Sequence, residues 1–100
     1  MEEKEFKKYI ESNELILADF NASWCLPCRA LSEEIETVEQ LLKDKVNILS
    51  VDIDSSEKLS SKYKITAVPS MIIFKNGIEC EKIVGYRSSD ELLEILNKYL

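Results

Sequence analysis

The sequence predicts an α/β fold in which a mixed sheet of about four strands is flanked by helices on both faces. Short apolar runs, typical of buried strands, alternate with stretches in which apolar residues recur at helical spacing. The intervals between the first strands are long enough for parallel crossovers through a helix. The dipeptide Asn76-Gly77, which lies between two apolar runs, indicates an antiparallel hairpin.

Composition and charge limit the class of protein. The chain has 100 residues, of which 45% are hydrophobic and 32% charged, and a chain of this length can bury one modest core. We therefore expect one domain over residues 1–100. The formal net charge is -6, which repels phosphate backbones and anionic lipids, so we expect neither nucleic acid nor a membrane as partner. Without a membrane-spanning run or a signal-peptide pattern, the sequence predicts a cytoplasmic protein.

The first half of the chain is predicted to form helix, strand, helix and strand. An amphipathic helix is expected over about residues 2–12, followed by a buried strand from Leu15 to Phe20. A helix of about 16–18 residues then begins at the cysteines, and Val46 to Ile53 forms a second buried strand. The apolar residues that set the two helical periodicities are Phe6, Tyr9 and Ile10, then Leu31, Ile35, Val38 and Leu42.

Two capping patterns mark the helices of the second half. Asp54, followed three residues later by Glu57, predicts the N-terminus of a short helix that runs to about Tyr63. Ser88 and Glu91 have the same spacing and predict the start of a last helix. The hairpin strands between these helices are Met71 to Lys75 and Ile78 to Val84, and the apolar face of the last helix consists of Leu92, Leu93, Leu96 and Tyr99.

The segment Cys25-Leu-Pro-Cys28 is the main candidate for chemistry. Cysteines at positions i and i+3 at the start of a helix lie close enough to form a disulfide. So short a loop stabilises the fold little, so the bond suits reversible opening. The helix N-terminus favours a thiolate on Cys25, expected to be the exposed cysteine, while Cys28 is expected to be more buried. Cys25 then attacks a substrate disulfide and Cys28 resolves the mixed disulfide.

The cysteines could also have other roles. The chain contains no His, which excludes a Cys–His or Ser–His pair and every imidazole metal ligand. A zinc or iron–sulfur site is the alternative for the pair, but the chain offers only Cys80 as a further thiol, so we expect no metal and no cofactor. Cys80 itself is interpreted as a small buried hydrophobic residue, with an oxidisable or dimer-forming thiol as the alternative. The odd cysteine count fits a reducing compartment.

Residues 18–29, Ala-Asp-Phe-Asn-Ala-Ser-Trp-Cys-Leu-Pro-Cys-Arg, resemble the active-site segment of the thioredoxin family. The resemblance covers about residues 15 to 100 and implies a thioredoxin-like fold. It also implies a protein-disulfide reductase whose substrates are disulfide-containing proteins and whose electron donor is a thioredoxin reductase, either NADPH-linked or ferredoxin-linked. The later stretches that agree are Val51-Asp-Ile-Asp54, Tyr63-Lys-Ile-Thr-Ala-Val-Pro-Ser70, Phe74-Lys-Asn-Gly77 and Val84-Gly-Tyr86.

The resemblance also implies roles for individual residues. Asp19 corresponds to a buried carboxylate that accepts a proton from Cys28, with an ordinary strand-end Asp as the alternative. Pro69 corresponds to a cis-proline that packs against the disulfide, and the backbone of Val68 is then free to pair with an extended substrate. The apolar contact surface implied around Cys25 consists of Trp24, Leu26, Pro27, Ile53, Val68, Gly85 and Tyr86, each of which could equally be a core or turn residue.

The chain also departs from the family pattern. The residues before the strand at Leu15 read as helix, so the first strand of the family is expected to be absent. Val46 to Ile53 then forms an edge of the sheet, in a protein that we expect to be a monomer. A disulfide oxidase or isomerase and a non-catalytic interaction module are the alternative functions. The substitutions are Leu26 for a glycine, Asn21 for an aromatic residue, Glu33 for a proline and Ser50 for a lysine.

Overall fold

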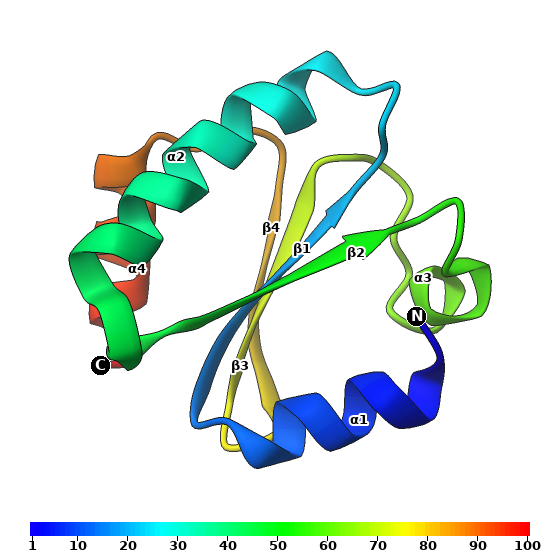
Figure 1. Ribbon diagram of the computed structural model, residues 1–100, viewed down its shortest axis with the longest axis horizontal. Helices are drawn as coiled ribbons and strands as arrows, with labels where there is room; N and C mark the ends of the chain where they lie inside the picture. The colour runs from blue at the N-terminus through cyan, green and yellow to red at the C-terminus, as the bar shows by residue number, and fades with distance from the viewer.

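The computed structural model describes residues 1–100 and confirms the predicted architecture. A four-stranded mixed sheet has the order β2-β1-β3-β4, with helices on both faces (Figure 1). No helix is long and apolar enough to cross a bilayer. The helices are α1 (Glu3–Ser12), α2 (Leu26–Leu42), α3 (Glu57–Lys62) and α4 (Ser89–Asn97), with a 3-10 turn η1 (Lys43–Lys45) after α2, and the strands are β1 (Leu15–Asn21), β2 (Asn47–Asp52), β3 (Ser70–Lys75) and β4 (Ile78–Val84).

The sheet is mixed because its connections differ. β1 pairs with β2 in parallel and with β3 in antiparallel orientation, and β3 and β4 form an antiparallel hairpin. Asn76 and Gly77 have φ angles of 52° and 81°, the two positive angles that a type I′ turn requires. Since the residues before β1 form a helix, β2 has a single neighbour and is an outer strand, as expected.

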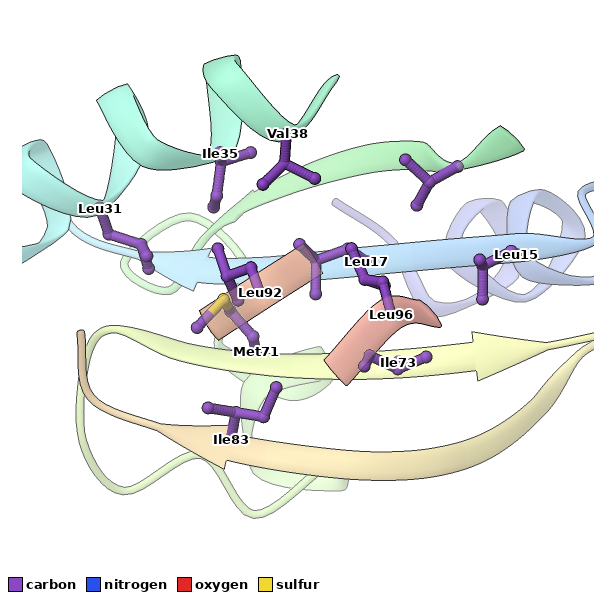
Figure 2. Close-up of a cluster of buried hydrophobic side chains, with 11 residues drawn as sticks. Leu15, Leu17, Leu31, Ile35, Val38, Met71, Ile73, Ile83, Leu92 and Leu96 are labelled. Carbon is purple, nitrogen blue, oxygen red and sulfur yellow. The ribbon is translucent and has the colours of Figure 1, made fainter. Parts of the chain in front are cut away.

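Each face of the sheet has its own hydrophobic core. Successive side chains of a strand point to opposite faces, so Leu15 and Leu17 of β1 lie beneath α2 and α4 (Figure 2), whereas Ile16, Ala18 and Phe20 lie beneath α1 and α3. The odd-numbered positions of β1 therefore face the helix that carries Cys28. The first core also contains Leu31, Ile35 and Val38 from α2 with Leu92 and Leu96 from α4, and the second contains Phe6 and Ile10 from α1 with Leu59 from α3.

The predicted N-cap of the short helix α3 is wrong. The N-cap is Ser56, which makes no side-chain capping hydrogen bond, and Asp54 lies in the preceding turn. The Asp52 carboxylate accepts a hydrogen bond of 2.9 Å from the backbone N–H of Asp54 and holds this turn, which delays the start of the helix. The amino group of Met1 donates to Ser56 Oγ at 2.5 Å, so the N-terminus of the chain lies beside α3 (Figure 1).

The predicted burial of Cys80 is also wrong. Cys80 is exposed and forms no disulfide. The register of the hairpin pairs Phe74 with Glu79 and Ile73 with Glu81, which leaves Cys80 without a cross-strand partner at a β-bulge. A bulge disrupts the alternation between core and solvent, and β4 is an outer strand with mostly exposed side chains. The alternation of apolar residues in the sequence does not predict this register shift.

Candidate active site

The cysteine pair lies where the loop after β1 enters α2 (Figure 1). Cys25 is the N-cap of this 17-residue helix, and its Sγ accepts a hydrogen bond of 3.2 Å from the backbone N–H of Cys28. Pro27 fits the first turn because the N–H that proline lacks has no intrahelical acceptor there. The two sulfurs are joined in a disulfide between Cα atoms 5.3 Å apart. The Cys25 sulfur therefore lies at the positive end of the helix dipole.

The two cysteines are equally buried, each with 5% of its surface exposed. The expected division into an exposed and a buried cysteine is therefore wrong for the disulfide form. Ala22 forms a buried cluster with the two cysteines, and Ile53 and Val68 pack against this cluster. Ile53 and Val68 come from separate loops. Their contacts with the cysteine cluster are therefore tertiary, and the position of the cysteines at the start of a helix does not predict them.

Asp19 lies on β1 and lines a pocket of about 380 Å³ together with Cys28. Its side chain is buried, with 6% of the residue exposed. Oδ2 accepts a hydrogen bond of 3.2 Å from Asn21 Nδ2, whereas Oδ1 has no hydrogen-bond partner. Burial raises the pKa of Asp19 to about 6, and the hydrogen bond from Asn21 opposes this rise. A carboxyl group with such a pKa can exchange a proton near neutral pH.

Asn21 and Ser50, marked in the sequence only as departures from the family pattern, lie beside this carboxyl group. Asn21 Nδ2 donates to Ser50 Oγ at 2.8 Å as well as to Asp19. Residues two apart on a strand share a face, so the sequence did contain a signal that places Asn21 beside Asp19. The position of Ser50 follows only from the parallel register, in which it is the partner of Asp19.

Two large apolar side chains flank Cys25 in the sequence and are exposed. Trp24 is 66% exposed and Leu26 is 72% exposed, while Pro27 is exposed as well. The indole N–H of Trp24 donates to Asp54 Oδ2 at 2.9 Å, which orients the ring. Asp54, which the sequence predicts as a helix N-cap, thus orients the exposed side chain of Trp24 instead.

Val68 brings a second segment of the chain to the cysteine pair, and Pro69 and Gly85 adjoin Val68. The Val68–Pro69 peptide bond is cis. Val68 packs against the cysteine pair, and its backbone N–H and C=O make no hydrogen bond within the chain. The C=O of Pro69 accepts a hydrogen bond of 2.8 Å from the N–H of Gly85, whose φ of 95° is a conformation that side-chain-bearing residues rarely adopt. Tyr86, next in the chain, is 45% exposed.

The groups brought together suit thiol–disulfide exchange, because two sulfurs close reversibly at a helix N-terminus beside a carboxyl group that can exchange a proton. No group of three or more His, Cys, Asp or Glu side chains is arranged to hold a metal ion. The ionisable and redox-active groups that the site brings together are the disulfide of Cys25 and Cys28 and the carboxyl group of Asp19.

Comparison with known proteins agrees with this geometry. The family model described as thioredoxin matches residues 1–98. The chain is 34% identical over 89 residues to thioredoxin from Bacillus subtilis, and the match covers 89% of this chain and 86% of that protein. It is 33% identical over 96 residues to thioredoxin from Staphylococcus aureus, covering 96% of this chain and 91% of the other.

Solved structures are similar over nearly the whole chain. A mutant thioredoxin from Halobacterium salinarum superposes with a TM-score of 0.91 at 29% identity, covering 99% of this chain and 86% of that one. Oxidised mitochondrial thioredoxin 3 from Saccharomyces cerevisiae has a TM-score of 0.87 at 27% identity, with coverage of 95% and 88%. The chain therefore belongs to the thioredoxin family, and it is a thiol–disulfide oxidoreductase that reduces protein disulfides through the Cys25–Cys28 pair.

Proposed function

We propose that Cys25 is the attacking cysteine and Cys28 the resolving cysteine. The observation that carries this assignment is the N-cap position of Cys25, whose sulfur already accepts the backbone N–H of Cys28. The same N–H and the helix dipole stabilise a thiolate on Cys25, whereas Cys28 lies within the first turn and receives no such hydrogen bond.

The reaction then proceeds in two exchanges. The Cys25 thiolate attacks one sulfur of a substrate disulfide, forms a mixed disulfide and expels the other substrate sulfur as a thiolate. Cys28 loses its proton and attacks the Cys25 sulfur, which forms the Cys25–Cys28 disulfide and releases the second substrate thiolate. The substrate gains two electrons and the cysteine pair loses two.

Asp19 is proposed to accept the proton of Cys28 in the second exchange. Both residues line the same pocket, and the pKa of about 6 leaves most of the carboxyl group ionised at neutral pH. Its unpartnered Oδ1 leaves one oxygen available for the proton.

An extended substrate segment is proposed to lie across the surface beside Cys25. The free N–H and C=O of Val68 offer it main-chain hydrogen bonds, as in addition of a strand to a sheet. The exposed side chains of Trp24 and Leu26 offer apolar contact. The complete contact surface is Trp24, Leu26, Pro27, Ile53, Val68, Pro69 and Gly85.

The setting of the reaction is proposed from the family and the composition. A reductase linked to NADPH or ferredoxin returns electrons to the cysteine pair, so the protein takes part in electron transport. We place it in the cytoplasm as a monomer that works as one domain over residues 1–100. The exposed free thiol of Cys80 supports a reducing compartment, because an oxidising one would modify it.

Trapping of mixed disulfides tests the order of attack. In a Cys80→Ser background, which removes the exposed competing thiol, Cys28→Ser should accumulate a mixed disulfide with insulin, a disulfide-linked protein, because the resolving thiol is missing. Cys25→Ser should trap little or none. Non-reducing electrophoresis and mass spectrometry measure the adduct, and equal trapping by both variants would refute the assignment.

A further inference from the structure

Asn21 is the one side chain that hydrogen-bonds to the carboxyl group of Asp19. The two hydrogens on its Nδ2 are shared among three acceptors, namely Asp19 Oδ2 at 3.2 Å, the main-chain oxygen of Asp19 at 3.1 Å and Ser50 Oγ at 2.8 Å. These three acceptors come from two neighbouring strands, β1 and β2. The amide is therefore held in place by groups other than the carboxyl oxygen that it contacts.

This contact makes the two carboxyl oxygens unequal. Oδ2 accepts the amide hydrogen, whereas Oδ1 is buried without a partner. A proton on Oδ2 would weaken its role as acceptor for the amide N–H, while a proton on Oδ1 leaves that hydrogen bond intact. We propose that Asn21 is a positioning residue of the reaction, which occupies Oδ2 and makes Oδ1 the atom that receives the proton of Cys28. This inference rests on the proposed role of Asp19 as proton acceptor.

The step balances with groups already described. The Cys28 thiol gives its proton to Asp19 Oδ1 within the pocket that both residues line. The electron pair left on the Cys28 sulfur forms the bond to the Cys25 sulfur. The bond between Cys25 and the substrate sulfur breaks, and its electron pair leaves with the substrate thiolate.

The other charged side chains that line the pocket make no contact with the Asp19 carboxyl group that could substitute for the hydrogen bond from Asn21. Arg29 from α2 and Asp52 from β2 line the same pocket. The guanidinium of Arg29 donates to the main-chain oxygen of Ser23 at 3.2 Å, and the Asp52 carboxylate accepts the N–H of Asp54 at 2.9 Å. Neither is paired with Asp19, and the residue opposite Asp19 on β3 is the apolar Met71. Apart from Asp19, Arg29 and Asp52, the one titratable residue that lines this pocket is Cys28.

The consequence is a measurable pH dependence. A donated hydrogen bond favours the carboxylate over the neutral acid, so Asn21 keeps Asp19 able to accept a proton at lower pH than burial alone would allow. Loss of the amide should move the rise of the resolution rate upward by about one pH unit, because a hydrogen bond to an ionised group is comparable to one pKa unit. At a pH below this rise, resolution by the variant without the amide should therefore be about tenfold slower than resolution by the unchanged protein at the same pH.

The test follows both exchanges in one experiment. Reduced protein in a Cys80→Ser background is mixed with one equivalent of dithiobis(nitrobenzoate), a symmetrical aromatic disulfide, in a stopped-flow instrument across the neutral pH range. Release of the first nitrobenzoate thiolate reports attack by Cys25, and release of the second reports resolution by Cys28. The ionisation of Asp19 in the oxidised protein is measured separately by carbon-13 NMR of its carboxyl group.

Two substitutions and one matched control give the comparison. Asn21→Leu removes the donor while keeping the number of side-chain heavy atoms and the branching, and Asn21→Asp places a like charge beside Asp19. Both should raise the midpoint of the second release and the Asp19 ionisation midpoint, the Asp variant more than the Leu variant. Asn47→Leu makes the same chemical change at the start of the neighbouring strand β2, outside the pocket, and should keep the original midpoints.

The outcomes separate the two claims. Equal midpoints in Asn21→Leu and the unchanged protein would overturn the role of Asn21. If Asp19→Asn abolishes the rise while Asn21→Leu leaves it in place, Asp19 remains the proton acceptor and only the inference on Asn21 fails. A rise that persists unchanged in Asp19→Asn removes the role of Asp19, and with it the role of Asn21.

Discussion

Among single residues, Asp19 combines a destabilising effect on the fold with a proposed role in the reaction. Its carboxyl group is buried, has no cationic partner and receives one side-chain hydrogen bond, from Asn21. An ionised group in this setting destabilises a fold, because its solvation in water is lost and is not fully replaced. The fold therefore keeps a destabilising carboxylate in the pocket that Cys28 also lines, where we propose that it accepts the proton of Cys28.

This cost predicts how stability depends on pH. The pKa of Asp19 is about 6 in the folded protein, against 3.8 for an unperturbed carboxyl group, so the folded state holds this proton more tightly. The contribution of Asp19 to the free energy of unfolding should fall as pH rises from about 4 to about 6, and remain low above that range. The loss is about 3 kcal/mol at 1.36 kcal/mol per pKa unit.

Asp19→Asn should accordingly be more stable than the unchanged protein by up to about 3 kcal/mol at alkaline pH, with the difference vanishing near pH 4. Denaturant unfolding of the two oxidised proteins across this range measures it. If the free energies of unfolding of the two proteins differ by the same amount at every pH, burial does not raise the pKa of Asp19.

At the scale of elements, α4 depends on a local capping structure that the sequence predicted correctly. Ser88 is the N-cap, its Oγ accepts the N–H of Glu91 at 3.2 Å, and the Glu91 carboxylate accepts the N–H of Ser88 at 3.0 Å. The backbone N–H and the hydroxyl group of Ser88, which both donate to the Glu91 carboxylate, lower the pKa of Glu91. Because α4 contributes Leu92 and Leu96 to a core, its start affects packing as well as local order.

Ser88→Ala should therefore lower the free energy of unfolding by about 1 kcal/mol at neutral pH, and Ser88→Gly by less. The contribution of the Glu91 carboxylate is present above its ordinary pKa and is lost as pH falls through the lowered value. Ser89→Ala is the matched control, because the Ser89 hydroxyl makes no hydrogen bond. Chemical unfolding measures all three, and an equal cost at Ser88 and Ser89 would contradict the capping role.

At the scale of the whole molecule, both outer strands of the sheet are open. β2 and β4 each pair with a single neighbour, and an open strand edge invites pairing with another chain. A net charge of -6 opposes self-association. The bulge at Cys80 interrupts the regular hydrogen bonding of β4, which also disfavours extension of the sheet on that side.

We therefore expect a monomer at micromolar concentration. Sedimentation of the Cys80→Ser protein measures this without dimers linked through the exposed thiol. A tight dimer that dissociates when proline replaces Asn47 on β2 would instead show that this edge is used for pairing, since proline removes a backbone donor.

The elements were predictable because their signals are local. The spacing of apolar residues located the long helix α2, and Asn76-Gly77 located the hairpin turn. The proximity of Cys25 and Cys28 was predictable for the same reason, since residues three apart in a helix are neighbours. The errors concern positions at which a distant residue or a register shift decides, namely the cap at Asp54, the burial of Cys80 and the exposure of Cys25.

The order of elements, the mixed sheet and a cysteine pair at a helix start follow from local signals, because periodicity, turn residues and capping residues act within a few positions. The surroundings of that pair depend on the tertiary fold. The parallel register places Ser50 opposite Asp19 and lets Asn21 contact both, while Ile53 and Val68 pack against the cluster that contains the cysteine pair. These contacts join segments far apart in the chain, and the packing of the whole fold sets their geometry.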